Sequence, residues 1–359
     1  MNFYWNAFGL VNLGLDLGIS GTFFALIFIN RRIQPGKPAF TIVRQAALGT
    51  ILLWILNGLF VGGIIGFSLV ARTFWTLFTA AIPLLLTFYA VREKKWLLFI
   101  PALLLVAFKY YGEVIEPNRL EVQHAVIHIK GLKKSVKIAH ISDLQTDGLR
   151  AMHNEVLAAV NGYGADFIFF TGDVLNHASL KEEIKSYLKS FKSQHGGFFV
   201  SGNVDGLLDL REFFKDTSFQ YLDGDYAKIK LEAGIVGIAG LGLEDYSDKI
   251  LLGKILDKLG KTDATMLLCH VPDALKTAEG LPVNMLFSGH THGGQVCLPW
   301  FGPIVTLSHV ARNIAAGGIH KVGDLYVVVS RGLGLEGHIA PRVRTFCRPQ
   351  VLLLELTPA

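Results

Sequence analysis

The sequence predicts an α/β protein in two parts, a set of apolar N-terminal helices followed by an α/β domain. Most of the apolar excess lies before residue 111, in runs long enough to cross a bilayer. Later in the chain, short apolar runs alternate with helical patterns, as in a sheet buried on both faces. Several of these runs end directly in polar clusters. We therefore expect a membrane domain at residues 1–111, a short linker at 112–120 and a second domain at 121–359.

The N-terminal third is too apolar for a soluble enzyme. The chain of 359 residues is 51% hydrophobic, with a mean hydropathy of +0.41. Residues 10–29, 46–70 and 74–91 are each expected to cross a bilayer, which takes about 20 apolar residues. Residues 96–111 form a shorter run with aromatic residues at both ends, typical of interfacial anchors, and a buried core helix is the alternative. We predict about four transmembrane helices, with Asp16 either a functional intramembrane acid or an interfacial residue.

Charge supports the same division and indicates a topology. Residues 1–110 carry nine Lys and Arg and two acidic residues, whereas the remainder carries 25 basic and 27 acidic residues. The pI of about 9.0 therefore reflects the membrane flanks and gives no argument for nucleic-acid binding. Basic residues gather in the first and third predicted loops, which the positive-inside rule keeps cytoplasmic, whereas the second holds only Arg72. With four spans the second domain faces the extracytoplasmic side, and without the fourth it faces the cytoplasm.

Five apolar runs are followed by residue types that bind metal ions. The runs are residues 136–141, 166–170, 197–200, 264–268 and 283–287. The polar residues that follow them are, in order, Asp143 with Gln145, Asp173, Asn203, His270, and His290 with His292. Open α/β sheets bind ligands at the carboxyl ends of their strands. A short G-H-x-H motif alone is more often an incidental turn, but these clusters together indicate a metal centre.

Other patterns complete the expected α/β domain. Residues 154–160 and 181–191 look helical. Two adjacent runs resemble a hairpin that takes the chain into a second sheet, and two late runs resemble strands: residues 227–231 with 235–239, and residues 325–330 and 351–356.

These motifs resemble the calcineurin-like metallophosphoesterase superfamily over residues 120–359. The family signature is D-x-H, G-D, G-N-H-D/E, a lone His and G-H-x-H. The matching residues here are Asp143, Asp173, Asn203, His270, and His290 with His292. Residues 289–299 and 330–334 are similar to the membrane-associated bacterial branch. The resemblance implies a sandwich of two mixed β-sheets flanked by helices.

The resemblance also implies two divalent metal ions and a role for each residue. Asp173 would bridge the ions; Asp143 and His292, with Gln145, would complete the first site, and Asn203, His270 and His290 the second. This donor set suits Mn, with Fe, Zn or Mg as alternatives. Two ions about 3.5–4 Å apart can share a hydroxide that attacks phosphorus in line, with no covalent intermediate. The predicted catalytic residues are Asp173, Asn203, His290 and Arg344.

Two residues depart from the family pattern. Gln145 stands where the family has the His of D-x-H, and its neutral amide is a weaker ligand than imidazole, so we expect a looser first site. Val204 stands where G-N-H-D has its second His, and valine cannot protonate a leaving group. This favours substrates with an acidic leaving group, a diester or pyrophosphate. Three other histidines, His177, His320 and His338, are candidates for the acid role, but ordinary solvated histidines are the commoner reading.

Two further segments bear on the substrate. Residues 298–305 are apolar and follow the G-H-x-H motif directly; if exposed they would contact an acyl chain or bilayer, and a packed loop is the alternative. Arg344, together with Arg331 and Arg342, could bind a phosphate, although ion pairing within the domain is the alternative. The cysteines, Cys269, Cys297 and Cys347, show no disulfide or metal spacing.

These expectations combine into a membrane-anchored, metal-dependent phosphoesterase. We expect it to hydrolyse a phosphodiester or pyrophosphate bond in a phosphorylated lipid or lipid-linked substrate, without nucleic acid and on the extracytoplasmic face. Protein partners are not predicted. A catalytically silent metal-binding scaffold is the alternative, because Gln145 and Val204 both weaken the usual site. A transporter or receptor with an appended phosphoesterase is a third reading, ranked last because four helices make a thin permeation path.

Overall fold

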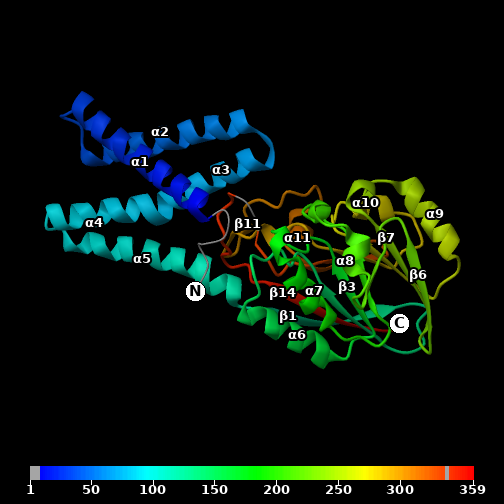
Figure 1. Ribbon diagram of the computed structural model, residues 1–359. Coiled ribbons are helices and arrows are strands. Elements are labelled where there is room, and N and C mark those ends of the chain that lie inside the picture. The colour runs from blue at the N-terminus through cyan, green and yellow to red at the C-terminus, as the bar shows by residue number, and fades with distance from the viewer. Residues whose placement is uncertain (1–8, 336–338) are drawn as a thin grey trace. The chain divides into compact units, whose positions relative to one another are not determined.

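The computed structural model describes residues 9–335 and 339–359 (Figure 1). It divides into two compact units. One is the described part of residues 1–115 and 336–342, and the other comprises residues 116–335 and 343–359. The first unit is helical, and the second contains the sheets.

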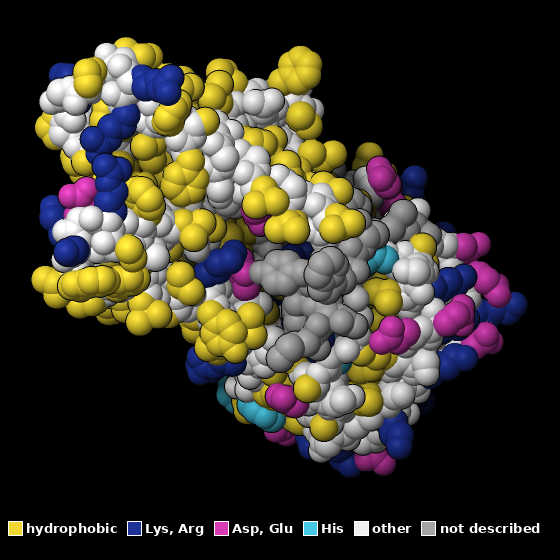
Figure 2. Space-filling model, turned by 60° about the vertical axis from the view of Figure 1, so that its left-hand side comes forward, with side chains coloured by type: hydrophobic (Ala, Val, Ile, Leu, Met, Phe, Trp, Pro, Cys, Tyr) yellow, Lys and Arg dark blue, Asp and Glu magenta, His cyan; other side chains and the backbone are white. Residues whose placement is uncertain are grey.

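The helical unit contains four apolar segments long enough to cross a membrane: Gly9–Ile33, Ala39–Val61, Gly63–Arg92 and Trp96–Asn118. Its α-helices are α1 Gly9–Ile33, α2 Ala39–Val61, α3 Gly63–Thr76, α4 Ile82–Arg92 and α5 Phe99–Tyr110. A π-helical turn at Leu77–Ala81 joins α3 to α4. Hydrophobic side chains cover much of this unit on the face shown in Figure 2. A helix that is apolar all round is typical of a membrane span.

The boundary between the second and third segments differs from the prediction. We expected spans at 46–70 and 74–91 with Arg72 in the loop between them, but the turn lies at Gly62 and Gly63, whose φ angles are +74° and +55°. Glycine adopts this left-handed backbone without steric cost. The apolar pattern runs through both glycines, so hydropathy did not mark the turn. Arg72 lies inside α3 and is buried.

Arg72 and Asp16 form an ion pair inside the helical unit. The Nη1 of Arg72 lies 3.0 Å from Oδ1 of Asp16, and the hydroxyl of Thr76 donates to the same oxygen at 2.6 Å. The guanidinium of Arg72 also donates to the backbone carbonyls of Ile339 and Ala340. Asp16 is thus paired with a cation between helices, so that neither charge is left uncompensated.

The second unit is a sandwich of two six-stranded mixed sheets, as predicted. The first sheet has the order β1 Glu121–Ile129, β14 Gln350–Pro358, β2 Val136–Ile141, β3 Phe167–Thr171, β4 Gly197–Val200 and β5 Phe219–Tyr221. The second has the order β12 Gly318–Val322, β13 Leu325–Val329, β9 Met285–Ser288, β8 Ala264–Cys269, β7 Gly234–Leu241 and β6 Tyr226–Leu231. A separate two-stranded hairpin consists of β10 Cys297–Leu298 and β11 Gly302–Pro303.

Helices cover the outer face of each sheet. Those packed on the first sheet are α6 Ala151–Tyr163, α7 Lys181–Lys189 and α8 Leu210–Phe214, and those on the second are α9 Lys249–Leu259, α10 Ala274–Ala278 and α11 Arg312–Ala315. The main core lies between the sheets, where the rings of Phe169 and Phe287 meet edge to face with centroids 4.8 Å apart. This core fixes the two sheets against each other and so positions the loops at their edges.

The five predicted apolar runs form β2, β3, β4, β8 and β9, and the predicted hairpin is β6–β7 in the second sheet. Strand β1 was not predicted from the sequence. Side chains along β1 alternate between half-buried and exposed over most of its length, because it is an edge strand paired only with β14. Its polar residues broke the apolar run on which the strand predictions depended.

Candidate metal centre

All seven predicted ligands lie on loops that leave the carboxyl ends of β2, β3, β4, β8 and β9. β2, β3 and β4 are parallel neighbours in one sheet, and β8 and β9 are parallel neighbours in the other. Parallel pairing brings the loops of each sheet to one edge. Backbone hydrogen bonds then tie the loops together, with Asp143 N donating to Gly172 O at 3.0 Å and Gly289 N to His270 O at 2.9 Å.

The backbone is left-handed at most of the predicted ligands. Positive φ angles occur at Asp143 (+49°), Asp173 (+60°), His290 (+67°) and His292 (+48°). Residues other than glycine rarely adopt this region, and such strain concentrates at functional sites. The sharp turns direct these side chains inward from the strand ends.

Two glycines allow the loops to approach closely. A Cβ at Gly202 would lie 2.2 Å from Oδ1 of Asp173, and one at Gly289 would lie 2.2 Å from Oδ2 of Asp143. Both contacts are far shorter than van der Waals distance, so a side chain at either position would displace a carboxylate. This explains the glycines that precede Asn203 and His290.

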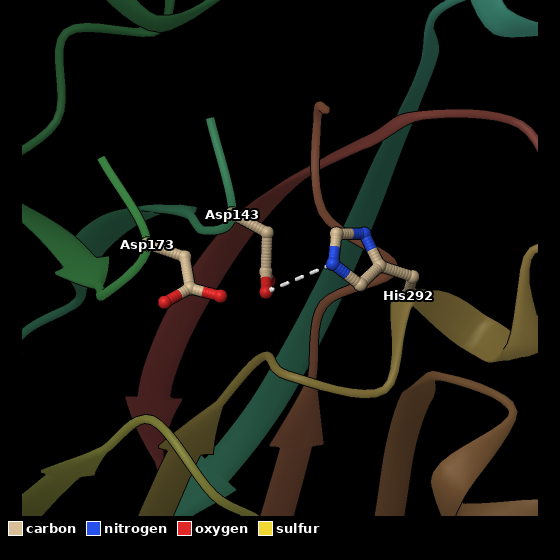
Figure 3. A group of neighbouring side chains, drawn as sticks. All are labelled: Asp143, Asp173 and His292. Carbon is tan, nitrogen blue, oxygen red and sulfur yellow. Dashed lines mark ion pairs between the residues drawn. The ribbon is translucent and has the colours of Figure 1, made fainter. Parts of the chain in front are cut away.

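Asp143, Asp173 and His292 form one group of possible ligands (Figure 3). One donor atom from each lies within 4.8 Å of the others, and all three side chains are buried. The Nε2 of His292 lies 3.6 Å from Oδ1 of Asp143. This spacing fits donor atoms around a single cation.

Asn203, His270 and His290 form a second group beside the first. The Oδ1 of Asn203 lies 3.1 Å from Nε2 of His270 and 3.0 Å from Nδ1 of His290. His270 Nε2 also lies 3.4 Å from Oδ2 of Asp173, so Asp173 stands between the two groups. The other ring nitrogen of His270 hydrogen-bonds to Thr171 O at 2.7 Å, which orients the ring and leaves Nε2 for the site.

The electrostatics of this cluster favour a bound cation. Burial raises the pKa of Asp143 to about 7, and the neighbouring Asp173 carboxylate adds to the increase. Burial alone would lower the pKa of His270, but Asp173 and Asp143 outweigh it and raise the value to about 10. Two buried carboxylates this close repel each other and attract positive charge. Strongly shifted pKa values of this kind mark candidate functional sites.

Gln145 supplies a direct test of whether a metal fits. Its Nε2 donates to Oδ2 of Asp173 at 2.9 Å, while its Oε1 is buried without a hydrogen-bond partner among the described residues. A buried acceptor without a partner costs free energy. An amide oxygen next to Asp173 is a suitable ligand for a divalent ion, so the residues present fit a metal at this position.

The structure argues against the phosphate contact predicted for Arg344. Its side chain is fully buried, and the guanidinium donates to the backbone carbonyls of Gly334 (2.7 Å) and Arg331 (2.8 Å). A guanidinium enclosed by carbonyls cannot reach a phosphate. Its Nη2 also lies 3.4 Å from Nδ1 of His292, so Arg344 holds the loop that carries a candidate ligand.

The three histidines considered for the acid role have different surroundings. His177 pairs with Asp147 at 3.1 Å, and the adjacent Asn176 donates to the backbone carbonyl of Gln145. His320 lies on β12 and hydrogen-bonds to Gly317 O. His338 lies outside the described residues. Of the two described histidines, His177 is therefore the one connected to a loop that carries a predicted metal ligand.

Asp205 has a role that the sequence analysis did not assign. It is buried, and its carboxylate accepts hydrogen bonds from the backbone N–H groups of Asp173, Val174 and Gly202. Asp205 thus ties the loop after β3 to the loop after β4. Its place as the last residue of the G-N-x-D pattern was the signal that could have identified it.

The structure also brings two cysteines together. The thiols of Cys297 and Cys347 lie 3.3 and 3.5 Å from the backbone carbonyl of Gly293. Val296 and Thr345 form a parallel β-bridge that places the cysteines side by side. Fifty residues separate them in the sequence, so spacing alone could not reveal this pair.

The two-sheet sandwich thus carries acidic, amide and imidazole groups at its strand ends, which are donor types that bind divalent metal ions. Residues 136–294 match the sequence model of the calcineurin-like phosphoesterases. Over these residues the chain is therefore similar to the calcineurin-like phosphoesterases, which are metal-dependent phosphoester hydrolases, as its motifs indicated.

The chain is similar to three bacterial proteins over different shares of its length. An uncharacterized metallophosphoesterase of Bacillus subtilis, YkuE, is 27% identical over 68% of this chain and 88% of its own length. The UDP-2,3-diacylglucosamine pyrophosphatase LpxG of Chlamydia trachomatis is 24% identical over 67% of this chain and 90% of its own length. The phosphodiesterase YaeI of Escherichia coli is 34% identical over 25% of this chain and 32% of its own length.

Proposed function

We propose that this protein is a membrane-anchored phosphoesterase that hydrolyses a phosphodiester or pyrophosphate bond in a lipid or lipid-linked substrate. The observation that carries the proposal is the position of Asp173 between two groups of donor atoms. One carboxylate shared by two sites is what a pair of closely spaced divalent ions requires. Two divalent ions, with Mn as our first choice, would lower the pKa of a water and polarise a phosphoryl oxygen.

The protein's own residues orient these components. Asp143, Gln145 and His292 would hold one ion, and Asn203, His270 and His290 the other, with Asp173 common to both. Val204 occupies the position of the missing histidine, and its backbone N–H donates to Oδ1 of Asp173 at 2.9 Å. It offers no proton to a leaving group. A diester or pyrophosphate, whose leaving group is already acidic, therefore suits the site better than an alkyl monoester.

Three observations support a lipid or lipid-linked substrate at a membrane. Four apolar segments could cross a bilayer. Arg119 and Leu120 alone separate the last of them from β1, so the tether is short. A relative matched over most of its length acts on UDP-2,3-diacylglucosamine. The positive-inside rule favours the extracytoplasmic face for the phosphoesterase domain, because basic residues gather at the first and third loops: Arg31, Arg32, Lys37 and Arg44, and Arg92, Lys94 and Lys95.

The test is hydrolysis by the purified full chain in detergent with Mn. We expect turnover of bis(p-nitrophenyl) phosphate and of a nucleotide-linked diacyl lipid, and much slower turnover of an alkyl phosphate monoester. Asp173→Asn should abolish turnover, whereas Asp257→Asn, a matched change at an exposed carboxylate on α9, should retain it. No turnover of any diester or pyrophosphate with Mn, Fe, Zn or Mg would contradict the proposal and favour the scaffold alternative.

A further inference from the structure

The segment that follows the G-H-x-H loop is an exposed apolar hairpin. Residues 298–307 contain no charged side chain. Large apolar side chains are exposed along it, at Leu298 (47%), Trp300 (104%), Phe301 (59%), Ile304 (53%), Val305 (42%) and Leu307 (54%). A packed loop, the alternative considered from the sequence, would bury these side chains. A contiguous exposed apolar surface of this kind marks an interaction site.

The hairpin is held in this exposed conformation. Cys297 pairs with Pro303 and Leu298 with Gly302 in an antiparallel ladder. Arg312 lies beneath it, with its guanidinium carbon 3.8 Å from the centroid of the Phe301 ring, and donates to the carbonyls of Phe301 and Pro303. Trp300 stands at the tip with a φ of +64°. The aromatic tip is thus presented on a fixed base.

Both ends of residues 298–307 are attached to loops that carry predicted metal ligands. At its start, a Cβ on Gly294 would lie 2.4 Å from Pro303, so the hairpin packs directly on the turn that follows His292. At its end, Ser308 Oγ donates to Asp273 at 2.6 Å and His309 N donates to the same carboxylate at 2.8 Å. Asp273 lies three residues after His270. Whatever the hairpin binds is therefore held beside the candidate metal centre.

We propose that residues 298–307 insert into one leaflet of the bilayer that the apolar helices span, with Trp300 at the tip. This inference rests on the membrane anchoring in the proposed function. Only a few residues join the last apolar segment to β1, so the phosphoesterase unit is tethered close to the bilayer. Tryptophan is enriched at membrane interfaces. The cation of Arg312 at the base of the hairpin could pair with the phosphate groups of the lipid headgroups that would surround an inserted tip.

The experiment measures insertion without measuring hydrolysis. The full chain would be reconstituted at one copy per nanodisc, as Trp300→Cys carrying an environment-sensitive fluorophore. Ile250→Cys provides the matched control, because Ile250 is a similarly exposed (72%) apolar residue on α9. Figure 1 shows α9 and β11 at opposite ends of the sandwich unit. The three native cysteines are buried, and unlabelled wild type gives the labelling blank.

The probe at position 300 should be blue-shifted and quenched severalfold more strongly by spin-labelled lipids than the probe at 250. Wild type should likewise lose more tryptophan emission to brominated lipids than Trp300→Phe, which tests insertion without a label. Asp173→Asn should insert normally, since insertion needs no activity. If the probes at positions 300 and 250 give equal signals typical of water, the insertion proposal is overturned and the proposed function stands. The same holds if the probe at position 300 becomes buried only after a diacyl substrate is added. A chain that does not enter the disc would overturn both.

Discussion

At the scale of single residues, the candidate site depends on side-chain donor atoms that loops from both sheets bring close together. Gln145 is the clearest case, because its amide nitrogen contacts Asp173 while its Oε1 is buried without a partner among the described residues. The family resemblance drew attention to position 145 because glutamine stands there in place of the family's histidine. The structure adds that the amide of Gln145 contacts the carboxylate of Asp173.

Replacing Gln145 with histidine should tighten metal binding at the first site. An imidazole is a stronger ligand than an amide oxygen for Mn, Fe or Zn, and we expect about a tenfold gain in affinity, or about 1.4 kcal/mol. Calorimetric titration of the metal-free chain with Mn measures it. Gln145→Leu, which removes the donor at similar size, should weaken the same site. Unchanged affinity in both variants would show that position 145 does not contact the metal.

At the scale of single elements, helix α6 makes the stability of the sandwich pH-dependent. His153 lies buried in its first turn, and its Nδ1 accepts a hydrogen bond from Arg150 N. Burial, with a contribution from the Arg150 charge, lowers the pKa of His153 to about 4. Because the ring must stay neutral to accept this bond, protonation opposes the folded state.

We expect His153 to contribute a decrease in the free energy of unfolding as the pH drops from about 6.5 to about 4, opposed by Asp143 and Asp205, whose pKa values burial raises to about 7. In this window the unfolded chain binds a proton at His153 that the folded chain does not, and below it both states are protonated. Burial also lowers the pKa of His140, to about 3, which adds to the same slope. Thermal unfolding at pH 7 and pH 5 measures the effect. His153→Asn, which keeps an acceptor, should make the change in Tm from pH 7 to pH 5 less unfavourable than it is in wild type, and an identical change in both proteins would contradict this account.

The ion pair between α1 and α3 should stabilise the helical unit. Arg72 is buried and Asp16 is partly buried, so removing one partner leaves the other charge uncompensated; for a fully buried pair this costs about 3–5 kcal/mol. Asp16→Asn and Arg72→Met should each lower the thermal unfolding temperature in detergent, Arg72→Met more strongly because Arg72 also binds the carbonyls of Ile339 and Ala340. The double variant should be less unstable than the sum of the single changes. Additive losses would show that the pair is not coupled.

At the scale of the whole molecule, the sequence predicted the architecture because its signals were local. Apolar length marked the helices that could cross a membrane, and short apolar runs ending in polar residues marked the strands and loops. Features that depend on distant contacts were missed or misread. Arg344 resembled a phosphate ligand from its residue type, but carbonyls of loops 10 and 13 residues earlier in the chain enclose it. Three other features could likewise be recognised only in the folded chain: the edge strand β1, the turn at Gly62 and the pairing of Asp16 with Arg72.

The central claim is that one buried carboxylate, Asp173, joins two metal sites built from loops on both sheets. Mn titration of the metal-free full chain, with bound metal counted by mass spectrometry, tests it most directly. We predict two ions per wild-type chain, two in Asp257→Ala, and neither held tightly in Asp173→Ala. Two tightly bound ions in Asp173→Ala, or none in the wild type, would contradict the account.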